Sequence, residues 1–369
     1  MILGLDVTLW LYVTLAGLFR LLWGVSQPLA LGVLSLAGFG ILAISNPIAA
    51  LYCSAQVALV LLLYVLGRRF PKSAVRISWF AFLGLVPANL QLWFGDQPIF
   101  SALHGSAEEG TLPLISWTAG SAFFVIRSFV ALREARQEGR LRFLSLLAGL
   151  SFLPAFPAGP IFGTQPFRPE RIAARIEARS IALAVMKLGW GIAAFYALAP
   201  ALRALAAGNG TSSLASVADV YLGFAALFFD FSGYTLMAIA MAAFFGITLP
   251  ENFNRPYLAT SIQDFWRRWH MSLNNFVGNY LFKPYVRLTG APRRGIFLAF
   301  VAVGMWHEFS VGYLLWGIGH GAALSLAMKP PKQWSGLMAR LPPWLSAGCG
   351  WFLTMTVVAV LSRIAVGHL

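Results

Sequence analysis

Residues 7–67 read VTLWLYVTLAGLFRLLWGVSQPLALGVLSLAGFGILAISNPIAALYCSAQVALVLLLYVLG and contain a single charged residue, Arg20. A helix needs about 20 predominantly apolar residues to cross a bilayer, so this stretch is long enough for three crossings. The breaks fall at Gln27-Pro28 and Asn46-Pro47, where proline interrupts a helix. We therefore expect an antiparallel helical meander with spans at 7–25, 28–44 and 47–67.

The rest of the 369-residue chain has the same character. Hydrophobic residues make up 59%, charged residues 11%, and the mean hydropathy is +0.72. A soluble domain typically carries about 25% charge, and a membrane barrel would show period-two alternation, so both classes are excluded. The sequence predicts an all-α polytopic membrane protein of about 9–11 transmembrane helices. Further spans are expected at 77–95, 112–132, 180–202, 217–247, 295–327 and 344–366.

The net charge of +14 could indicate nucleic acid, but the basic residues lie in short loops between apolar runs. They are better explained by membrane orientation, so no nucleic-acid partner is expected. Basic loops at 68–76 and 133–142 are predicted to be cytoplasmic, and the acidic 96–111 loop to face outward. The N-terminus is then also outside. No basic residue precedes Arg20, so we expect a retained first span rather than a cleaved signal peptide.

The apolar run 143–163, FLSLLAGLSFLPAFPAGPIFG, lies between the basic groups 133–142 and 168–179. The positive-inside rule places both groups in the cytoplasm, which one crossing cannot satisfy. Broken backbone at membrane depth must be shielded by protein or line a watery cavity. We therefore predict that 143–163 is re-entrant and that 168–179 is a helix at the cytoplasmic surface. An ordinary span followed by a loop that ignores the rule is the alternative.

Residues 250–294 are too polar to cross a membrane and too aromatic for a solvated linker. Aromatic rings with a polar edge suit the membrane interface. We expect this segment to lie along or dip into the cytoplasmic face, with interfacial rings at Trp266, Trp269, Tyr257, Tyr280 and Tyr285.

Histidines at membrane depth are candidates for chemistry. A shielded imidazole such as that of His307 can take a proton from a hydroxyl and return it, as a general base does. A hydrogen bond between helices is the alternative for His307 and for His320, thirteen residues later. His270 is preceded by Arg267 and Arg268, which could hold anionic headgroups or the phosphates of a nucleotide-linked donor.

Carboxylates at or near membrane depth need partners. Asp230 lies in the middle of an apolar run and is expected to pair with an arginine or with hydroxyl and backbone donors, chiefly as a structural group. Asp264, at the membrane edge, and Glu308 are interpreted as structural polar residues as well.

Sites of several soluble enzymes are excluded. The chain has no GxxxxGK[ST] phosphate loop and no HExxH pair. Cys53 and Cys349 are isolated in apolar runs, so neither belongs to a CxxC metal site. His307 and Glu308 are adjacent, so their side chains point in different directions on a helix and cannot easily share one metal ion. The sequence therefore predicts neither a metal site nor a bound cofactor.

The run FFDFSGYTLMAIAMAAFFGITLPENFNRPYLATSIQDFWRRWHMSL, followed by GMWHEF and LLWGIGHG, resembles the membrane-bound O-acyltransferase family. The resemblance is closest to the bacterial branch of alginate O-acetylation and teichoic-acid D-alanyl transfer. It covers 228–321, and FLPAFPAGPI resembles a further family element; residues 1–140 match only in hydropathy. It implies one integral membrane domain over 1–369, with N-terminal helices at 1–140, the catalytic core at 141–328 and a C-terminal helix at 329–369.

The resemblance implies an enzyme that transfers an acyl group from a cytoplasmic thioester, acyl-CoA or an acyl carrier, to a hydroxyl reached from the other face. His307 matches the family's catalytic histidine, and His270 matches the polar position of the R-W-H-x-S-L element. On this reading Arg267, Arg268, Trp306 and His320 bind substrate. Asn274 and Asn275 are candidates to stabilise the oxyanion by their chemistry.

The sequence departs from the family at two places. It has Trp306-His307-Glu308 where W-H-G is common, and Gly278-Asn279 where an Arg-Asp pair is common. These departures leave open a changed donor or acceptor, a D-alanyl or other acyl group, and a non-catalytic scaffold. A transporter is a further alternative, although it should show paired inverted halves.

The expected acceptor is an exported or cell-envelope polysaccharide. Arginines outnumber lysines 22 to 5, a mild compositional hint of a GC-rich genome and so of acetyl transfer. The resemblance further implies the bacterial inner membrane, with membrane lipid around the chain and a periplasmic acyltransferase- or esterase-like partner. Docking of that partner is expected at the outer loops 96–111 and 203–216.

Overall fold

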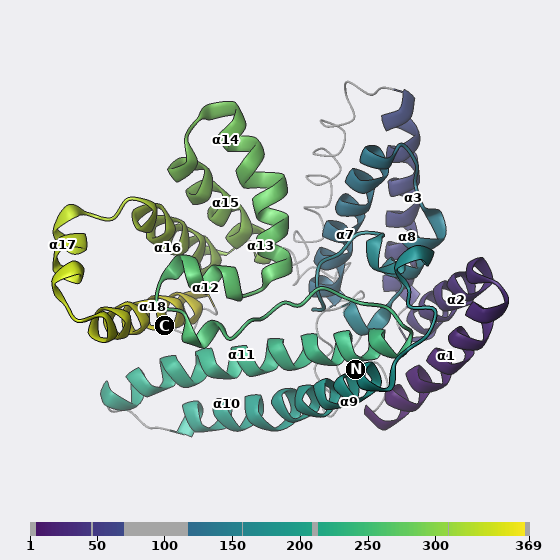
Figure 1. The fold of residues 1–369 in the computed structure, drawn as a ribbon, viewed down its shortest axis with the longest axis horizontal. Coiled ribbons are helices and arrows are strands. Elements are labelled where there is room, and N and C mark those ends of the chain that lie inside the picture. The colour runs from purple at the N-terminus through teal and green to yellow at the C-terminus, as the bar shows by residue number, and fades with distance from the viewer. Residues whose placement is uncertain are drawn as a thin grey trace, which may run out of the picture. The chain divides into compact units, whose positions relative to one another are not determined.

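The computed structural model describes residues 5–45, 47–69, 117–156, 158–208, 213–308 and 310–365. Within these ranges the chain is helical and contains no strand (Figure 1). It divides into two compact units, one of Met1–Trp190 with Tyr234–Pro250 and one of Gly191–Gly233 with Glu251–Leu369. The predicted organisation as a single membrane domain stays a prediction.

The first unit opens with three helices in succession, α1 (Leu5–Val25), α2 (Gln27–Ser45) and α3 (Pro47–Arg69). Each packs on the next, and the breaks fall at the two predicted X-Pro steps. The three helices predicted from 7–67 are therefore confirmed, whereas membrane crossing by the first and third stays a prediction.

Helix α7 (Trp117–Glu138) is followed by α8 (Phe143–Leu150), and prolines interrupt the chain after α8. A single 3-10 turn, Leu153–Ala155, follows, and the backbone beyond it is irregular. Arg127 of α7 is fully buried and donates to the carbonyls of Ala155 and Pro160, while the Tyr234 hydroxyl donates to Pro154 O at 2.9 Å. Protein side chains thus satisfy this broken backbone, as membrane depth requires. Re-entry itself stays a prediction.

The predicted surface helix at 168–179 is wrong. The chain there forms 3-10 turns at Gln165–Phe167 and Pro169–Arg171, and α9 (Ala178–Ala193) begins only at the end of the segment. The reason is long-range: Arg20 donates to Ala173 O at 2.6 Å and to Ala174 O at 2.5 Å, and Ala173 N donates to Gly246 O. Backbone groups that bond to distant partners are not available for a local helix.

Five helical segments in the described residues are long and apolar enough to cross a membrane. In length and composition they agree with the spans predicted at 28–44, 180–202, 217–247 and 344–366, whereas the span predicted at 112–132 stays a prediction. The predicted span at 77–95 and loop at 96–111 lie outside the described residues. The five segments are α2, the run of α9, a π-helical turn (Ala194–Leu198) and α10 (Ala199–Gly208), α11 (Ser213–Phe244), α16 (Val311–Met328) and α18 (Pro343–Ala365).

The span predicted as one unit over 295–327 is two helices, α15 (Pro292–His307) and α16. They form an antiparallel hairpin, since Arg293 Nε donates to Ser325 O at 3.0 Å and Ser325 Oγ donates to Arg293 O at 2.8 Å. The basic residues in the first turn of α15 and directly after α16 therefore lie at the same end of the hairpin. His307 lies at the other end, at the turn.

Local chemistry explains this turn. Ser310 begins α16 as its N-cap, its hydroxyl accepting from Tyr313 N at 3.3 Å. Gly304 and Gly317 face each other across the hairpin: a Cβ on Gly317 would lie 2.7 Å from Phe300 O. Small residues let membrane helices approach this closely.

The aromatic segment 250–294 forms short helices: a 3-10 turn (Pro256–Leu258), α12 (Ile262–Arg268), α13 (Met271–Val277), a π turn (Gly278–Phe282) and α14 (Lys283–Thr289). Trp266 and Trp269 are buried in the protein, so their predicted interfacial position is wrong. Trp269 packs 5.0 Å from Phe253 and 5.4 Å from Phe265. Burial among rings, rather than contact with lipid, accounts for these tryptophans.

A surface helix, α17 (Lys332–Arg340), links α16 to α18.

Candidate active site

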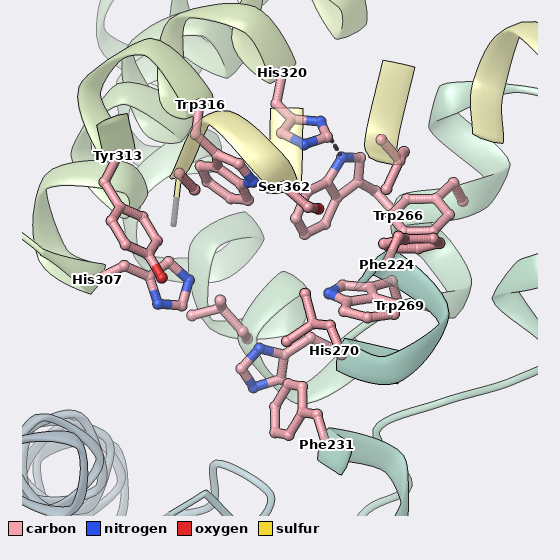
Figure 2. Close-up of a pocket in the computed structure, with 15 residues that line it drawn as sticks. Phe224, Phe231, Trp266, Trp269, His270, His307, Tyr313, Trp316, His320 and Ser362 are labelled. Carbon is pink, nitrogen blue, oxygen red and sulfur yellow. Dashed lines mark hydrogen bonds between the residues drawn. The ribbon is translucent and has the colours of Figure 1, made fainter. Parts of the chain in front are cut away.

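A cavity of about 140 Å³ lies within the second unit (Figure 2). Residues of α11, α12, α13, α15, α16 and α18 line it, together with Trp269 and His270 between α12 and α13. Three of the five histidines of the chain, His270, His307 and His320, are in this lining. The cavity therefore brings together the three histidines that the sequence singled out.

His307 is the last residue of α15, and its side chain is exposed where it lines the cavity. The centre of its ring lies 4.7 Å from that of Trp306. The Tyr313 ring stacks on it at 5.6 Å, and the Trp316 ring meets it edge-on, also at 5.6 Å. Figure 2 shows the imidazole beside Tyr313 at one side of the cavity. The hairpin turn thus places this imidazole on the wall of the cavity.

His270 is buried and lies in the left-handed region of backbone space, with φ 41° and ψ 54°. Its ring meets the ring of Phe231 edge-on at 4.7 Å. Burial lowers the pKa of His270 well below its ordinary value, and nearby His307 lowers this pKa further. The imidazole is therefore neutral near pH 7, with one ring nitrogen that donates a hydrogen bond and one that accepts.

His320 is buried, and its Nδ1 accepts the indole N–H of Trp266 at 3.2 Å. An indole N–H can only donate, so Nδ1 carries no proton and the neutral ring holds its proton on Nε2. The edge of Trp316 packs on the same ring at 4.6 Å. Two tryptophans thus fix both the tautomer and the orientation of His320.

The lining contains no aspartate, glutamate, lysine or arginine. Apart from the histidines, its polar side-chain groups are the hydroxyls of Tyr313 and Ser362 and the indole N–H groups of three tryptophans. The remaining lining residues are phenylalanines and aliphatic residues. Such a cavity suits neutral reacting groups, since an unpaired charge would be costly there.

The arginine pair lies apart from this lining. Arg268 Nε donates to Asp264 Oδ2 at 2.8 Å, and the exposed Arg267 lies 3.9 Å from Asp264. Ser261 caps α12 by accepting from Asp264 N at 3.1 Å. Asp264 therefore acts as a structural partner at the start of α12. Substrate binding by the arginines stays a prediction.

The other predicted substrate contacts are also outside the lining. Asn274 is half-buried and Asn275 exposed on α13, and Trp306 reaches the site through its contact with the His307 ring. Glu308 follows α15 with extended backbone, φ −160° and ψ 139°. Since any residue adopts this conformation, the departure from the W-H-G pattern requires no change in the fold there.

Asp230 has the arginine partner that was expected. Its carboxylate lies 3.1 Å from Arg203 of α10, which runs beside α11 (Figure 1). At the second departure, Asn279 Oδ1 accepts from Lys283 Nζ at 2.8 Å, a link between neighbouring helical turns. Within the ranges that the structure describes, no cluster of three His, Cys, Asp or Glu side chains could hold a metal ion.

Sequence reasoning missed Tyr313, Phe231 and Asn252. Tyr313 stacks on His307, Phe231 meets His270 edge-on, and Asn252 binds the residues that follow His270. The signal for Tyr313 was the capping serine three residues earlier, which indicates a new helix directly after His307. Phe231 and Asn252 reach the site only through long-range folding.

The profile of the membrane-bound O-acyltransferase family matches residues 116–361. Peptidoglycan O-acetyltransferase of Helicobacter pylori is 47% identical over 107 residues, 27% of this chain and 20% of that protein. A probable alginate O-acetylase AlgI of Pseudomonas aeruginosa is 41% identical over 118 residues, 29% of this chain and 22% of that protein. Teichoic acid D-alanyltransferase of Streptococcus thermophilus is 27% identical over 240 residues, 58% of this chain and 57% of that protein.

The chain thus aligns with about a fifth of the length of the first two relatives. The family profile reaches further and takes in the broken segment after α8, the short helices around His270 and the hairpin that carries His307. With its helical fold and apolar spans, this chain belongs to the membrane-bound O-acyltransferase family.

Proposed function

We propose that the protein is a membrane O-acyltransferase that moves a small acyl group, acetyl, from a thioester to a hydroxyl of an envelope or exported polysaccharide. The observation that supports this most is the uncharged cavity lined by both His307 and His270. The donor would be acyl-CoA or an acyl carrier, with no cofactor bound. The acceptor could also be a hydroxyl of a periplasmic partner protein.

In the proposed reaction, His307 takes the proton of the acceptor hydroxyl as its oxygen attacks the thioester carbonyl carbon. The new C–O bond forms and the C–S bond breaks, and the thiol leaves with the proton that His307 returns. His270, neutral and held against Phe231, would orient or polarise the donor. The apolar walls keep water away from the thioester, which limits its hydrolysis.

The lining favours acetyl over D-alanyl transfer. A D-alanyl group carries an ammonium ion, and none of the residues that line the cavity supplies a carboxylate to pair with it. The phosphates of a CoA donor would likewise remain outside. Within this proposal, the protein therefore transfers acetyl, as the names of the O-acetylating relatives indicate for those proteins.

The test is acyl transfer by purified protein in nanodiscs, with acetyl-CoA as donor and alginate oligosaccharides or peptidoglycan fragments as acceptors. General-base catalysis is worth about 10²–10⁴-fold, so His307→Ala should lower the rate of thiol release by that factor. Thr354→Ala is the control, because its hydroxyl donates only to Gly350 O of its own helix. Wild-type turnover by His307→Ala would refute the assignment.

The same assay separates the alternatives. A transporter or a non-catalytic scaffold would release no thiol from the donor, with or without acceptor. A D-alanyl transferase would leave acetyl-CoA intact but consume a D-alanyl carrier thioester. The location in a bacterial inner membrane, the periplasmic N-terminus and the periplasmic partner protein are further parts of this proposal.

A further inference from the structure

Helix α13 begins in an unusual way. Its N-cap residue is His270, whose side chain makes no capping hydrogen bond. Helices normally begin at Ser, Thr, Asp or Asn, whose oxygen accepts one of the first backbone N–H groups. The preceding helix, α12, follows this rule with Ser261, and α16 follows it with Ser310. The start of α13 therefore has to find its acceptors elsewhere.

Asn252, in the loop after α11, supplies them. Its backbone oxygen accepts from Met271 N at 2.9 Å, and its Oδ1 accepts from Ser272 N at 3.3 Å. Oδ1 also accepts from the Ser272 hydroxyl at 2.5 Å, and the Asn252 residue is fully buried. A residue 20 positions away in sequence thus caps the first two positions of α13.

The same loop holds the backbone on the other side of His270. Asn254 N donates to Arg268 O at 2.9 Å, so hydrogen bonds to the loop flank His270 before and after. Between them His270 adopts φ 41°, a conformation that side-chain-bearing residues rarely take unless their surroundings impose it. The two flanking contacts therefore account for the left-handed backbone at this position.

We propose that Asn252 is a positioning residue for His270. A side chain at position 270 that capped α13 would point back at the helix. It could then not face the cavity, so one side chain cannot serve as both the helix cap and a group in the site. Asn252 takes over the capping, and the His270 imidazole then faces the cavity that His307 also lines. The effect on catalysis rests on the proposed function; the effect on the imidazole does not.

The first experiment observes the imidazole directly. The protein is labelled with ¹³Cε1-histidine in nanodiscs, and the signals of its five histidines are assigned with single His→Ala variants. Asn252→Ala should shift or broaden the His270 signal and leave that of His320 in place, because His320 is fixed by Trp266. Thr354→Ala is the control for general perturbation of the second unit.

An unmoved His270 signal in Asn252→Ala would overturn the proposal. So would equal shifts of His320 and His270, which would show general disturbance of the fold. Should Asn252→Ala not be recovered folded, Ser272→Ala tests the same contact from the other partner, because it removes the hydroxyl that donates to Oδ1. Ser272→Ala should then shift the His270 signal and leave that of His320 in place. An unmoved His270 signal, or equal shifts of the two signals, would again overturn the proposal.

The second experiment is a double-mutant cycle on the acyl-transfer rate. Displacing a group that orients a reacting side chain typically costs about 10–100-fold, so Asn252→Ala should lower kcat by that factor. Added to His270→Ala, the same change should cost less than about 2-fold, since the residue through which it acts is gone. An equal loss in both backgrounds would contradict the proposal. If wild-type protein transfers no acyl group, the proposed function fails, while the histidine signals still decide the role of Asn252.

Discussion

Trp266 and Trp351 each donate an indole N–H to one acceptor, but they differ in burial. Trp266 is buried and donates to His320 Nδ1, whereas Trp351 is 44% exposed and donates to Tyr257 O at 2.7 Å. Trp266→Phe keeps most of the ring and leaves a buried acceptor without its donor, which costs about 1–3 kcal/mol. Trp351→Phe should cost less, because water can replace the donor. Denaturant unfolding of both variants in detergent measures the difference.

The same substitution releases the His320 tautomer. In the Trp266→Phe variant the ring proton can occupy either nitrogen, so the ¹⁵N shifts of His320 should move toward averaged values. In Trp351→Phe they should stay at wild-type positions. Equal unfolding free energies for the two variants, or an unchanged His320 spectrum, would contradict the importance of this bond.

The sequence allowed His307, His270 and His320 to be predicted as site residues because titratable side chains are rare in apolar runs. The walls of the cavity could not be predicted, because Phe231 and Val358 look like any other residue of a span. Arg267 and Arg268 pair with Asp264, one turn away, and their predicted role in substrate binding stays a prediction. Titratable side chains that are rare in apolar runs can be recognised in the sequence as candidate site residues. The residues that line the cavity or cap α13 cannot, because their positions depend on tertiary contacts.

At the level of helices, the α15–α16 hairpin depends on close backbone approach. A methyl group on Gly317 would lie 2.7 Å from Phe300 O and 3.0 Å from Val301 Cα. Overpacking of this kind typically costs about 1–3 kcal/mol, so Gly317→Ala should lower the unfolding free energy by that amount. Gly223→Ala, in α11, is the control, because no atom lies within 4 Å of the added carbon. If the two variants unfold at the same denaturant concentration, the packing argument is wrong.

Helices predicted from long apolar runs were recovered where the breaks are prolines, as in α1, α2 and α3. The break between α15 and α16 was missed because it falls at Glu308 and Ser310 inside a largely apolar run. A capping serine is a weaker signal than a proline, although it decides where His307 lies. The irregular chain at 168–179 could not be predicted, because Arg20 and Gly246 lie far away in sequence.

For the molecule as a whole, the hairpin fixes which ends share a side of the membrane. Arg294 and Lys332 should lie on the same side, whereas Val217, at the start of the apolar part of α11, should lie on the opposite side. We expect cysteines at positions 294 and 332 to react with an impermeant maleimide from the cytoplasm, and a cysteine at 217 from outside. The background replaces Cys53 and Cys349 by serine. If the cysteines at 294 and 332 were labelled from opposite sides, the result would contradict the hairpin and support a single crossing over 295–327.

The cavity walls carry no fixed charge, although the chain as a whole carries +14. Dissolved ions screen exposed charges within about 10 Å at 0.1 M salt but act little on a neutral interior. Raising ionic strength should therefore weaken capture of an anionic donor, seen as a higher KM, and leave kcat nearly constant. A kcat that falls in step with added salt would place a charged group in contact with the reacting atoms.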